Sequence, residues 1–151
     1  MKARTNLRTV DVPQADSLPL VRRLVEAIEE GNRTNPDLAS RTGFSERHVR
    51  YRLEAARILG LADEEYRLTL GGRRLLATRP GSEEERAELR HAVKASKVAK
   101  AVRLDPSSSR PLDMGRISKK IMSLTGLSLA TAERRARTLR SWSRQVVGNR
   151  E

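Results

Sequence analysis

Four arginines recur at intervals of three or four residues near the end of the chain, namely Arg134, Arg137, Arg140 and Arg144. Residues at this spacing lie toward one side of a helix. A guanidinium group donates two parallel hydrogen bonds to a phosphate or to the O6 and N7 atoms of guanine. The chemistry that this pattern offers is therefore recognition of a polyanion, not the making or breaking of bonds.

Side chains that could carry out catalysis or hold a metal ion are sparse and scattered. The chain has no cysteine, and its two histidines, His48 and His91, are far apart in the sequence. No spacing of histidine and carboxylate residues suits a metal ion. Gly71-Gly72 is not followed by the Lys-Ser/Thr of a phosphate-binding loop. The sequence therefore predicts a protein that is not an enzyme and that uses no cofactor and no metal.

A motif that could position such arginines occurs twice, over residues 38–56 and 121–139. In both copies Thr-Gly-(Phe or Leu)-Ser separates two helical patterns, with glycine at the turn and serine as the cap of an arginine-rich second helix. This order predicts two helix-turn-helix motifs, whose second helix fits a DNA major groove. Aligned without a gap, the copies share Ser40/Ser123, Thr42/Thr125, Gly43/Gly126, Ser45/Ser128 and Arg52/Arg135.

The elements around the first motif can be read from its apolar spacing and its caps. A helix is expected over 18–30, a second one from Asn35-Pro36 with asparagine as the cap and proline at the first helical position, and a third from Ser45 to about Leu59. An acidic turn at 63–65, strand-like alternation at 66–68 and a short helix capped by Thr69 would then form a wing.

Residues 17–79 resemble a winged-helix domain of the bacterial transcription-regulator type, and the segment YRLTLGGRRLL resembles the wing strand and following helix of that family. The resemblance implies a mainly α fold with a winged helix-turn-helix domain over 17–81 and a DNA-binding role. The acidic residues of the wing are unfavourable beside phosphate, so this wing is expected to stay off the DNA or to contact protein.

A second, wingless trihelical helix-turn-helix unit is expected over 82–151. Ser82 and Glu85 form a capping-box pattern that begins a long helix ending near Leu104. A loop over 105–111 and helices over 114–125 and 129–147 follow. The combination with RRARTLRSW resembles domains of restriction-modification and phage-defence proteins. Residues 1–16 are polar and unpatterned, which predicts a flexible arm.

The charge of the chain is concentrated in its second half. The 151 residues carry a net charge of +12. Residues 1–85 hold 15 Lys/Arg and 14 Asp/Glu, whereas residues 86–151 hold 16 and 5. A basic half of this kind is the electrostatic footprint of nucleic-acid binding, so a polyanion is expected to contact the second unit first.

Helical geometry selects the residues that would meet DNA. In the last helix, Leu129 is expected on the core face with Trp142 at its edge, and Arg134 and Arg137 reach bases beside the small Ala130. The alternative for each basic face is a solvated surface, and Arg52 and Arg135 are expected to be structural, with their guanidinium heads free. The predicted DNA-contacting residues are Ser45, Arg47, Arg50, Tyr51, Ser128, Thr131, Arg134, Arg137, Arg140, Ser141 and Arg144.

These observations favour a duplex-DNA-binding protein, a transcription regulator or defence-system accessory, that is cytoplasmic and nucleoid-associated. Each unit would place its third helix in a major groove. Two alternatives stay open: a protein-interaction adaptor that uses the winged helix, and an RNA- or ribosome-binding protein. No membrane partner is expected, because no apolar run approaches about 20 residues. A homodimer through the 83–104 helix is left open, although the basic face of that helix argues against self-pairing.

Overall fold

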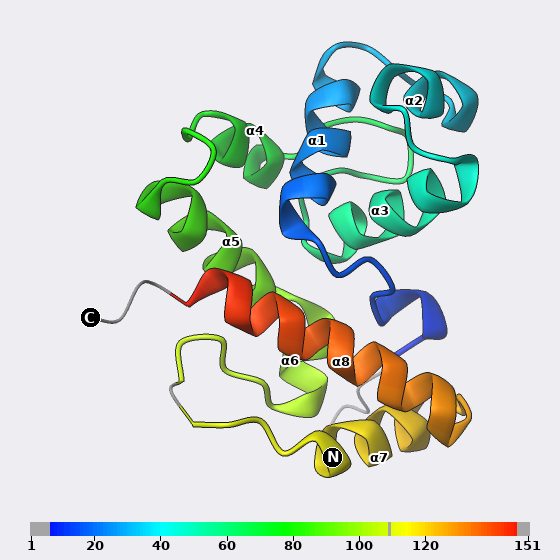
Figure 1. Ribbon diagram of the computed structural model, residues 1–151, viewed down its shortest axis with the longest axis vertical. Coiled ribbons are helices and arrows are strands. Elements are labelled where there is room, and N and C mark those ends of the chain that lie inside the picture. The colour runs from blue at the N-terminus through cyan, green and yellow to red at the C-terminus, as the bar shows by residue number, and fades with distance from the viewer. Residues whose placement is uncertain (1–6, 109, 148–151) are drawn as a thin grey trace, which may run out of the picture.

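The computed structural model describes residues 7–108 and 110–147, and within them the chain is mainly helical (Figure 1). In the first and second units, three helices lie around a glycine turn, over 18–58 and 97–146, and two further helices lie between these groups. In order, the elements are η1 (Thr9–Asp11), α1 (Leu18–Glu29), α2 (Asn35–Thr42), α3 (Glu46–Ile58), α4 (Leu70–Leu76), α5 (Glu83–Ala95), α6 (Lys97–Val102), α7 (Met114–Thr125) and α8 (Leu129–Val146).

Both predicted helix-turn-helix turns are confirmed, and they have the same geometry. Gly43 ends α2 at φ 78° and Gly126 ends α7 at φ 79°, the left-handed conformation that glycine adopts without a steric penalty. Ser45 and Ser128 then cap α3 and α8, each accepting a hydrogen bond from the backbone N–H three residues on. The sequence repeat is thus a structural repeat.

The cap of α2 differs from the prediction by one residue. Thr34, not Asn35, is the cap: its backbone is extended and its hydroxyl accepts from the Asp37 N–H at 3.2 Å. Asn35 is the first helical residue, and its side-chain oxygen accepts from the Tyr66 hydroxyl at 2.8 Å. The asparagine side chain is therefore used to hold the wing segment against α2 instead of capping the helix.

The wing is shorter than the sequence suggests. Among the described residues its only pairing is one antiparallel bridge between Ala62 and Leu68, so the strand expected at 66–68 does not extend further. Tyr66 has a left-handed backbone with φ 59°, which interrupts the extended alternation that a strand needs. Thr69 caps α4 as expected, with its hydroxyl accepting from the Gly72 N–H.

The single long helix predicted from Ser82 to Leu104 is wrong, because the chain breaks at Ser96. This residue is extended, and its hydroxyl donates to the Val93 carbonyl at 2.6 Å and accepts from the Ala99 N–H at 3.3 Å. A serine hydroxyl can replace backbone hydrogen bonds in this way and so end one helix and begin the next. The break redirects α6, which packs against α7 as the first helix of the second trihelical unit.

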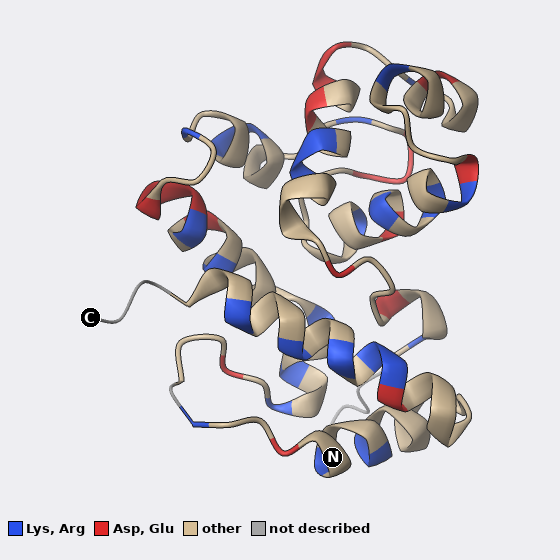
Figure 2. Ribbon diagram, in the orientation of Figure 1, with Lys and Arg blue, Asp and Glu red and all other residues tan. Residues whose placement is uncertain are grey.

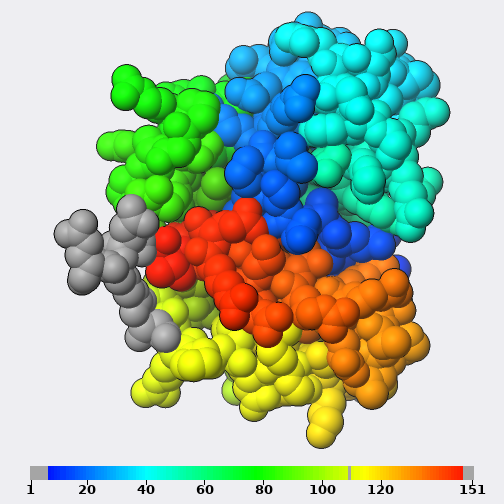
Figure 3. Space-filling model, viewed as in Figure 1, coloured from blue at the N-terminus to red at the C-terminus, as the bar shows by residue number. Residues whose placement is uncertain are grey.

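The flexible arm predicted over 1–16 is also wrong for residues 7–16, which we call the strap; residues 1–6 lie outside the described part. Leu7, Val12 and Ala15 of the strap are buried. The space-filling view shows it in the seam between the first unit and α8 (Figure 3). Its contacts join the two units, since Trp142 of α8 donates from its indole N–H to the Ala15 carbonyl at 2.8 Å.

A buried cation links α1 to the segment that leads into the second unit. The Arg22 guanidinium donates to the Glu85 carboxylate at 2.7 Å and to the carbonyls of Leu75 and Thr78. The predicted boundary between 17–81 and 82–151 falls in the turn between α4 and α5, directly beside this cluster. The two units therefore share both an ion pair and a hydrophobic core.

Substitution by alanine should lower the free energy of unfolding at one helical glycine and raise it at another. A Cβ atom on Gly72 would overlap the Leu61 carbonyl, because α4 packs directly on that backbone. Gly72→Ala should therefore lower the free energy of unfolding by about 1–3 kcal/mol or more. The matched variant is Gly115→Ala in α7, where only the Asp113 side chain is near, at 3.6 Å. It should raise the free energy of unfolding, by up to about 1 kcal/mol. Urea unfolding of both variants measures this, and equal effects would contradict the packing of α4.

Candidate nucleic-acid interface

The outer face of α8 is the most exposed basic surface that a recognition helix offers in this protein. Ala132, Ala136 and Leu139 of α8 are fully buried, which fixes the rotation of the helix against α7 and α5. Arg134, Arg137 and Arg144 then point to solvent. Figure 2 shows basic residues at intervals along the visible side of α8. Leu129 is exposed to 49%, so the expectation that it belongs to the core is wrong.

Within the described residues the arginines of α8 form no ion pairs, whereas five arginines of the first unit do. Every ion pair among residues 7–108 and 110–147 joins residues between positions 8 and 97. Residues 98–147 contain eleven Lys/Arg and three Asp/Glu. The positive charge of the second unit is therefore not neutralised within the described chain, and it creates a field that attracts polyanions.

The first turn of α8 carries a small polar network. The Ser128 hydroxyl accepts from the Thr131 N–H at 3.3 Å and donates to the Thr131 hydroxyl at 3.1 Å. Arg134 donates to the same hydroxyl oxygen at 3.2 Å. Ser128 is thus a structural cap, whereas Thr131 orients Arg134. The Ser141 hydroxyl accepts from Gln145 at 2.8 Å, which occupies it within the helix.

Arg140 and Arg144 lie with Arg110 around a cavity of about 420 Å³ between the second half of α8 and residues 105–112. Among the described residues, none of these three guanidinium groups has an ion-pair partner. Asp105 also lines the cavity, so three guanidinium groups and one carboxylate surround this space and its net charge is positive. This placement separates Arg140 and Arg144 from Arg134 and Arg137, which lie nearer the start of the helix.

On α3, Arg47, Arg50 and Tyr51 form one cluster. Arg47 donates from Nε to the Tyr51 hydroxyl at 2.9 Å. The guanidinium carbons of Arg47 and Arg50 lie 5.5 and 5.7 Å from the centre of the tyrosine ring, in cation–π range. The hydrogen bond from Arg47 lowers the pKa of Tyr51 below its ordinary value. The structure therefore brings these three predicted residues together beside the Ser45 cap.

The second half of the α3 face is covered. Glu54 points outward by helical geometry, yet it is only partly exposed. Burial raises the pKa of Glu54, and the nearby Arg57, Arg135 and Arg50 oppose that rise. Because Arg135 belongs to α8, the start of α8 must lie close to the outer face of α3. Sequence periodicity could not reveal this, since it treats each helix as if it were alone.

The expectation that Arg52 and Arg135 keep their heads free is wrong, although both are structural. The Arg52 guanidinium lies 4.1 Å from the centre of the Phe44 ring. Arg135 donates to the strap carbonyls of Thr9 at 2.7 Å and Val12 at 3.1 Å. Desolvation by burial lowers the pKa of both guanidinium groups. The shared position in the repeat was the one sequence signal that marked these two arginines together.

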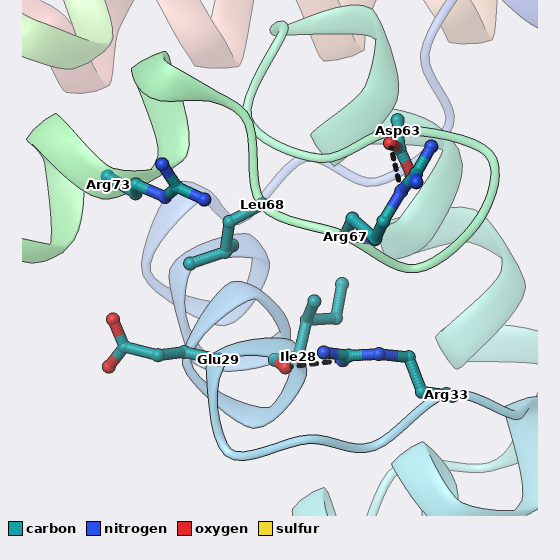
Figure 4. A pocket seen from close by; sticks show the side chains of 7 residues that line it. All are labelled: Ile28, Glu29, Arg33, Asp63, Arg67, Leu68 and Arg73. Carbon is teal, nitrogen blue, oxygen red and sulfur yellow. Dashed lines mark hydrogen bonds and ion pairs between the residues drawn. The ribbon is translucent and has the colours of Figure 1, made fainter.

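A cavity of about 640 Å³ lies beside the wing, and two of the arginines that line it already bind partners within the protein (Figure 4). Arg67 pairs with Asp63 at 3.0 Å and with Glu65 at 2.9 Å. Arg33 donates to the Ile28 carbonyl at the end of α1 at 2.8 Å. The wing therefore offers little uncompensated positive charge to a phosphate backbone.

The fold of the first unit agrees with the comparison of the chain with protein-family models. Residues 23–108, more than half of the chain, match the model described as "wHTH-PRTase associated". The chain belongs to this family, and it carries a winged helix-turn-helix domain. The matched region runs from α1 through α6 and leaves α7 and α8 outside. No curated protein and no solved structure matches the chain.

The described residues offer neither a metal site nor a membrane-spanning helix. Within 7–108 and 110–147, no three histidine, cysteine or carboxylate side chains gather closely enough to hold a metal ion. No helix in this part of the chain has the length and apolar composition that a membrane span requires.

Replacing Glu54 by glutamine should stabilise the fold in a pH-dependent way. Burial in the folded state raises the pKa of Glu54 above its ordinary value of 4.5. Above the raised pKa, the ionised side chain lowers the free energy of unfolding. Below pH 4.5 the side chain is protonated in both the folded and the unfolded state, and this cost is absent. Glu54→Gln should therefore raise the free energy of unfolding at neutral pH, and this gain should vanish at lower pH. Chemical unfolding at several pH values measures it, with Glu133→Gln on α8 as the control. A loss of stability at neutral pH would show that its arginine neighbours outweigh burial.

Proposed function

We propose that this protein binds duplex DNA and that α8 is its principal recognition helix. The observation that carries the proposal is the exposed, unpaired arginine face of α8, presented by a glycine turn and a serine cap of helix-turn-helix geometry. Among the described residues, no carboxylate forms an ion pair with an arginine of this face. Phosphates of a nucleic acid supply the missing negative charge.

The residues of this face divide by position into base and phosphate contacts. Ala130 is small and lets the start of α8 approach the base edges, where Arg134 and Arg137 reach guanine. Arg140 and Arg144 hold phosphates further along. On α3, the Arg47, Arg50 and Tyr51 cluster is the secondary contact. Ser45 and Ser128 mark the helix starts, where backbone N–H groups can face a phosphate. Thr131 orients Arg134, and Ser141 lies on the same side of α8 as these arginines.

In the cell, this activity would serve transcription regulation or a defence system. The winged helix-turn-helix domain fits a regulator, and the second unit is the part that resembles defence proteins. Either role places the protein with the nucleoid in the cytoplasm. A homodimer through residues 83–104 has little support, because the break at Ser96 removes the straight helix that such a pairing would use.

Removing the outer arginines of α8 should weaken DNA binding more than removing those of α3. We expect Arg134→Ala with Arg137→Ala to reduce affinity at least roughly 30-fold, because two guanine contacts of about 1–3 kcal/mol each are lost. Arg47→Ala with Arg50→Ala should cost less, since these side chains are partly occupied by Tyr51. Fluorescence anisotropy on labelled duplex measures both pairs.

The control removes the same charge from another face of the basic half, with Lys94→Ala and Lys100→Ala on α5 and α6. For the unmodified protein, affinity should fall roughly 10³- to 10⁵-fold from low to physiological salt if about 6–10 phosphates are contacted. A binding curve that does not respond to salt would refute the proposal. An equal loss in all three double variants would refute the assignment to α8.

A protein-interaction adaptor is the second candidate, and the first unit favours it. Its ion pairs are mostly internal, its wing is acidic, and the α3 face is partly covered. The family description also names association with a PRTase, the usual abbreviation for a phosphoribosyltransferase. In this proposal the winged-helix unit docks such an enzyme while α8 holds DNA.

The adaptor role can be separated from DNA binding by affinity purification with nuclease treatment. A tagged chain should retain a phosphoribosyltransferase after nuclease digestion, and Asp63→Asn with Glu64→Gln in the wing should release it. The Arg134→Ala and Arg137→Ala double variant is the control that keeps the wing intact. Loss of the enzyme with nuclease alone would show that DNA, not the winged helix, bridges the two proteins.

A further inference from the structure

Both recognition helices bind the same few backbone atoms of the strap. Arg57 of α3 donates to the Val10 carbonyl at 2.9 Å, and Arg135 of α8 donates to the neighbouring Thr9 carbonyl at 2.7 Å. The buried Asp11 side chain lies between, 3.9 Å from Arg57 and 3.5 Å from Lys97 of α6. Three helices of the two units are thus fixed to η1.

The far end of the strap is fixed to α8 as well. Gln145 accepts from the Leu18 N–H at 2.8 Å and donates to the Asp16 carbonyl at 2.5 Å. The buried Trp142 indole donates to the Ala15 carbonyl at 2.8 Å. Because these contacts run along about half the length of α8, they fix the direction of that helix relative to the first unit, and not only its position.

This arrangement sets an upper limit on the separation of α3 and α8 at the point where both contact the strap. An arginine side chain spans at most about 8 Å from Cα to its terminal nitrogen. Two such chains bound to neighbouring carbonyls keep the Cα atoms of Arg57 and Arg135 less than about 30 Å apart, even when both are fully extended. Figure 1 shows α3 and α8 on either side of η1. Helices that read successive major grooves lie about 34 Å apart.

The same contacts decide which of the two helices can enter a groove. The partly buried Glu54 lies on the outer face of α3, near Arg135 of α8, so the second half of that face is shielded. The outer face of α8 remains open at Arg134 and Arg137. A major groove about 12 Å wide admits one helix. With the second half of its outer face shielded beside α8, α3 cannot insert along its length as an independent reading head.

We infer that the strap joins the two helix-turn-helix units into one rigid reading surface, which binds a single short segment of duplex DNA. In this mode α8 enters one major groove, and the first turn of α3, with Arg47 and Arg50, rests on the phosphates beside that groove. The inference rests on the proposed DNA binding, and it replaces the expectation that each unit occupies a major groove of its own.

The first test is a hydroxyl-radical footprint on a duplex selected from a random pool. One continuous protected stretch of at most about 15 base pairs is expected, less than one and a half helical turns. A duplex trimmed to that stretch should keep the affinity of its parent within a factor of about two. Two protected patches a full turn apart, or a large loss of affinity on trimming, would overturn the inference while leaving DNA binding intact.

The second test measures whether the units separate on binding. The chain has no cysteine, so Ser40→Cys and Ser123→Cys place two spin labels at equivalent positions of the repeat, on α2 and α7 and away from both recognition helices. Pulsed electron spin resonance should give the same distance with and without the trimmed duplex. A shift to a longer distance on adding duplex would show that the strap opens, and would overturn the inference.

A matched variant links the result to the strap itself. Trp142→Phe with Gln145→Ala removes strap hydrogen bonds without altering the exposed arginines. It should broaden the distance distribution and weaken binding to the selected duplex about tenfold, whereas Lys119→Ala with Lys120→Ala should leave the distance unchanged. An unchanged distribution in the strap variant would contradict the role of the strap. Absence of binding by the unmodified protein to any duplex at low salt would instead refute the proposed function.

Discussion

The arrangement of this protein depends on a short turn of backbone held between cationic side chains from different helices. Carbonyl groups of residues 9–12 accept hydrogen bonds from Arg57 and Arg135, and Asp11 lies within ion-pair distance of Arg57 and Lys97. A buried carboxylate such as Asp11 is costly unless it is paired. Together these contacts tie α3, α6 and α8 to η1, and they restrict the relative position of the two units.

The two units also differ in how their charged side chains are paired. Several arginines of the first unit form ion pairs: Arg41 with Glu30 and Arg67 with Asp63 and Glu65 inside the unit, and Arg22 with Glu85 at its boundary. From residue 98 onward, the described chain has no ion pair. The first unit therefore behaves as a nearly neutral support, and the second unit presents the positive surface that a polyanion would meet.

Features that depend on neighbouring residues could be predicted from the sequence, and features that depend on distant ones could not. Gly126 and Ser128 are identified by local turn and cap chemistry, and the exposed side of α8 follows from helical periodicity. The break at Ser96 is also local, but a serine within a helical pattern gives little warning of it. The contact from Arg135 to Thr9 spans 126 positions and ends on a backbone carbonyl, which leaves no pattern in the side chains. The partial covering of Glu54, and with it the unequal exposure of the two candidate faces, follows from that contact.

Trp142 is the only tryptophan of the chain, it is fully buried, and its indole N–H binds the Ala15 carbonyl of the strap. The emission of this one fluorophore depends on the polarity around its ring and on that hydrogen bond. Detachment of the strap would admit water to the indole and shift its spectrum to longer wavelength. The protein thus contains a natural optical reporter of whether its two halves are engaged, and no dye has to be attached to read it.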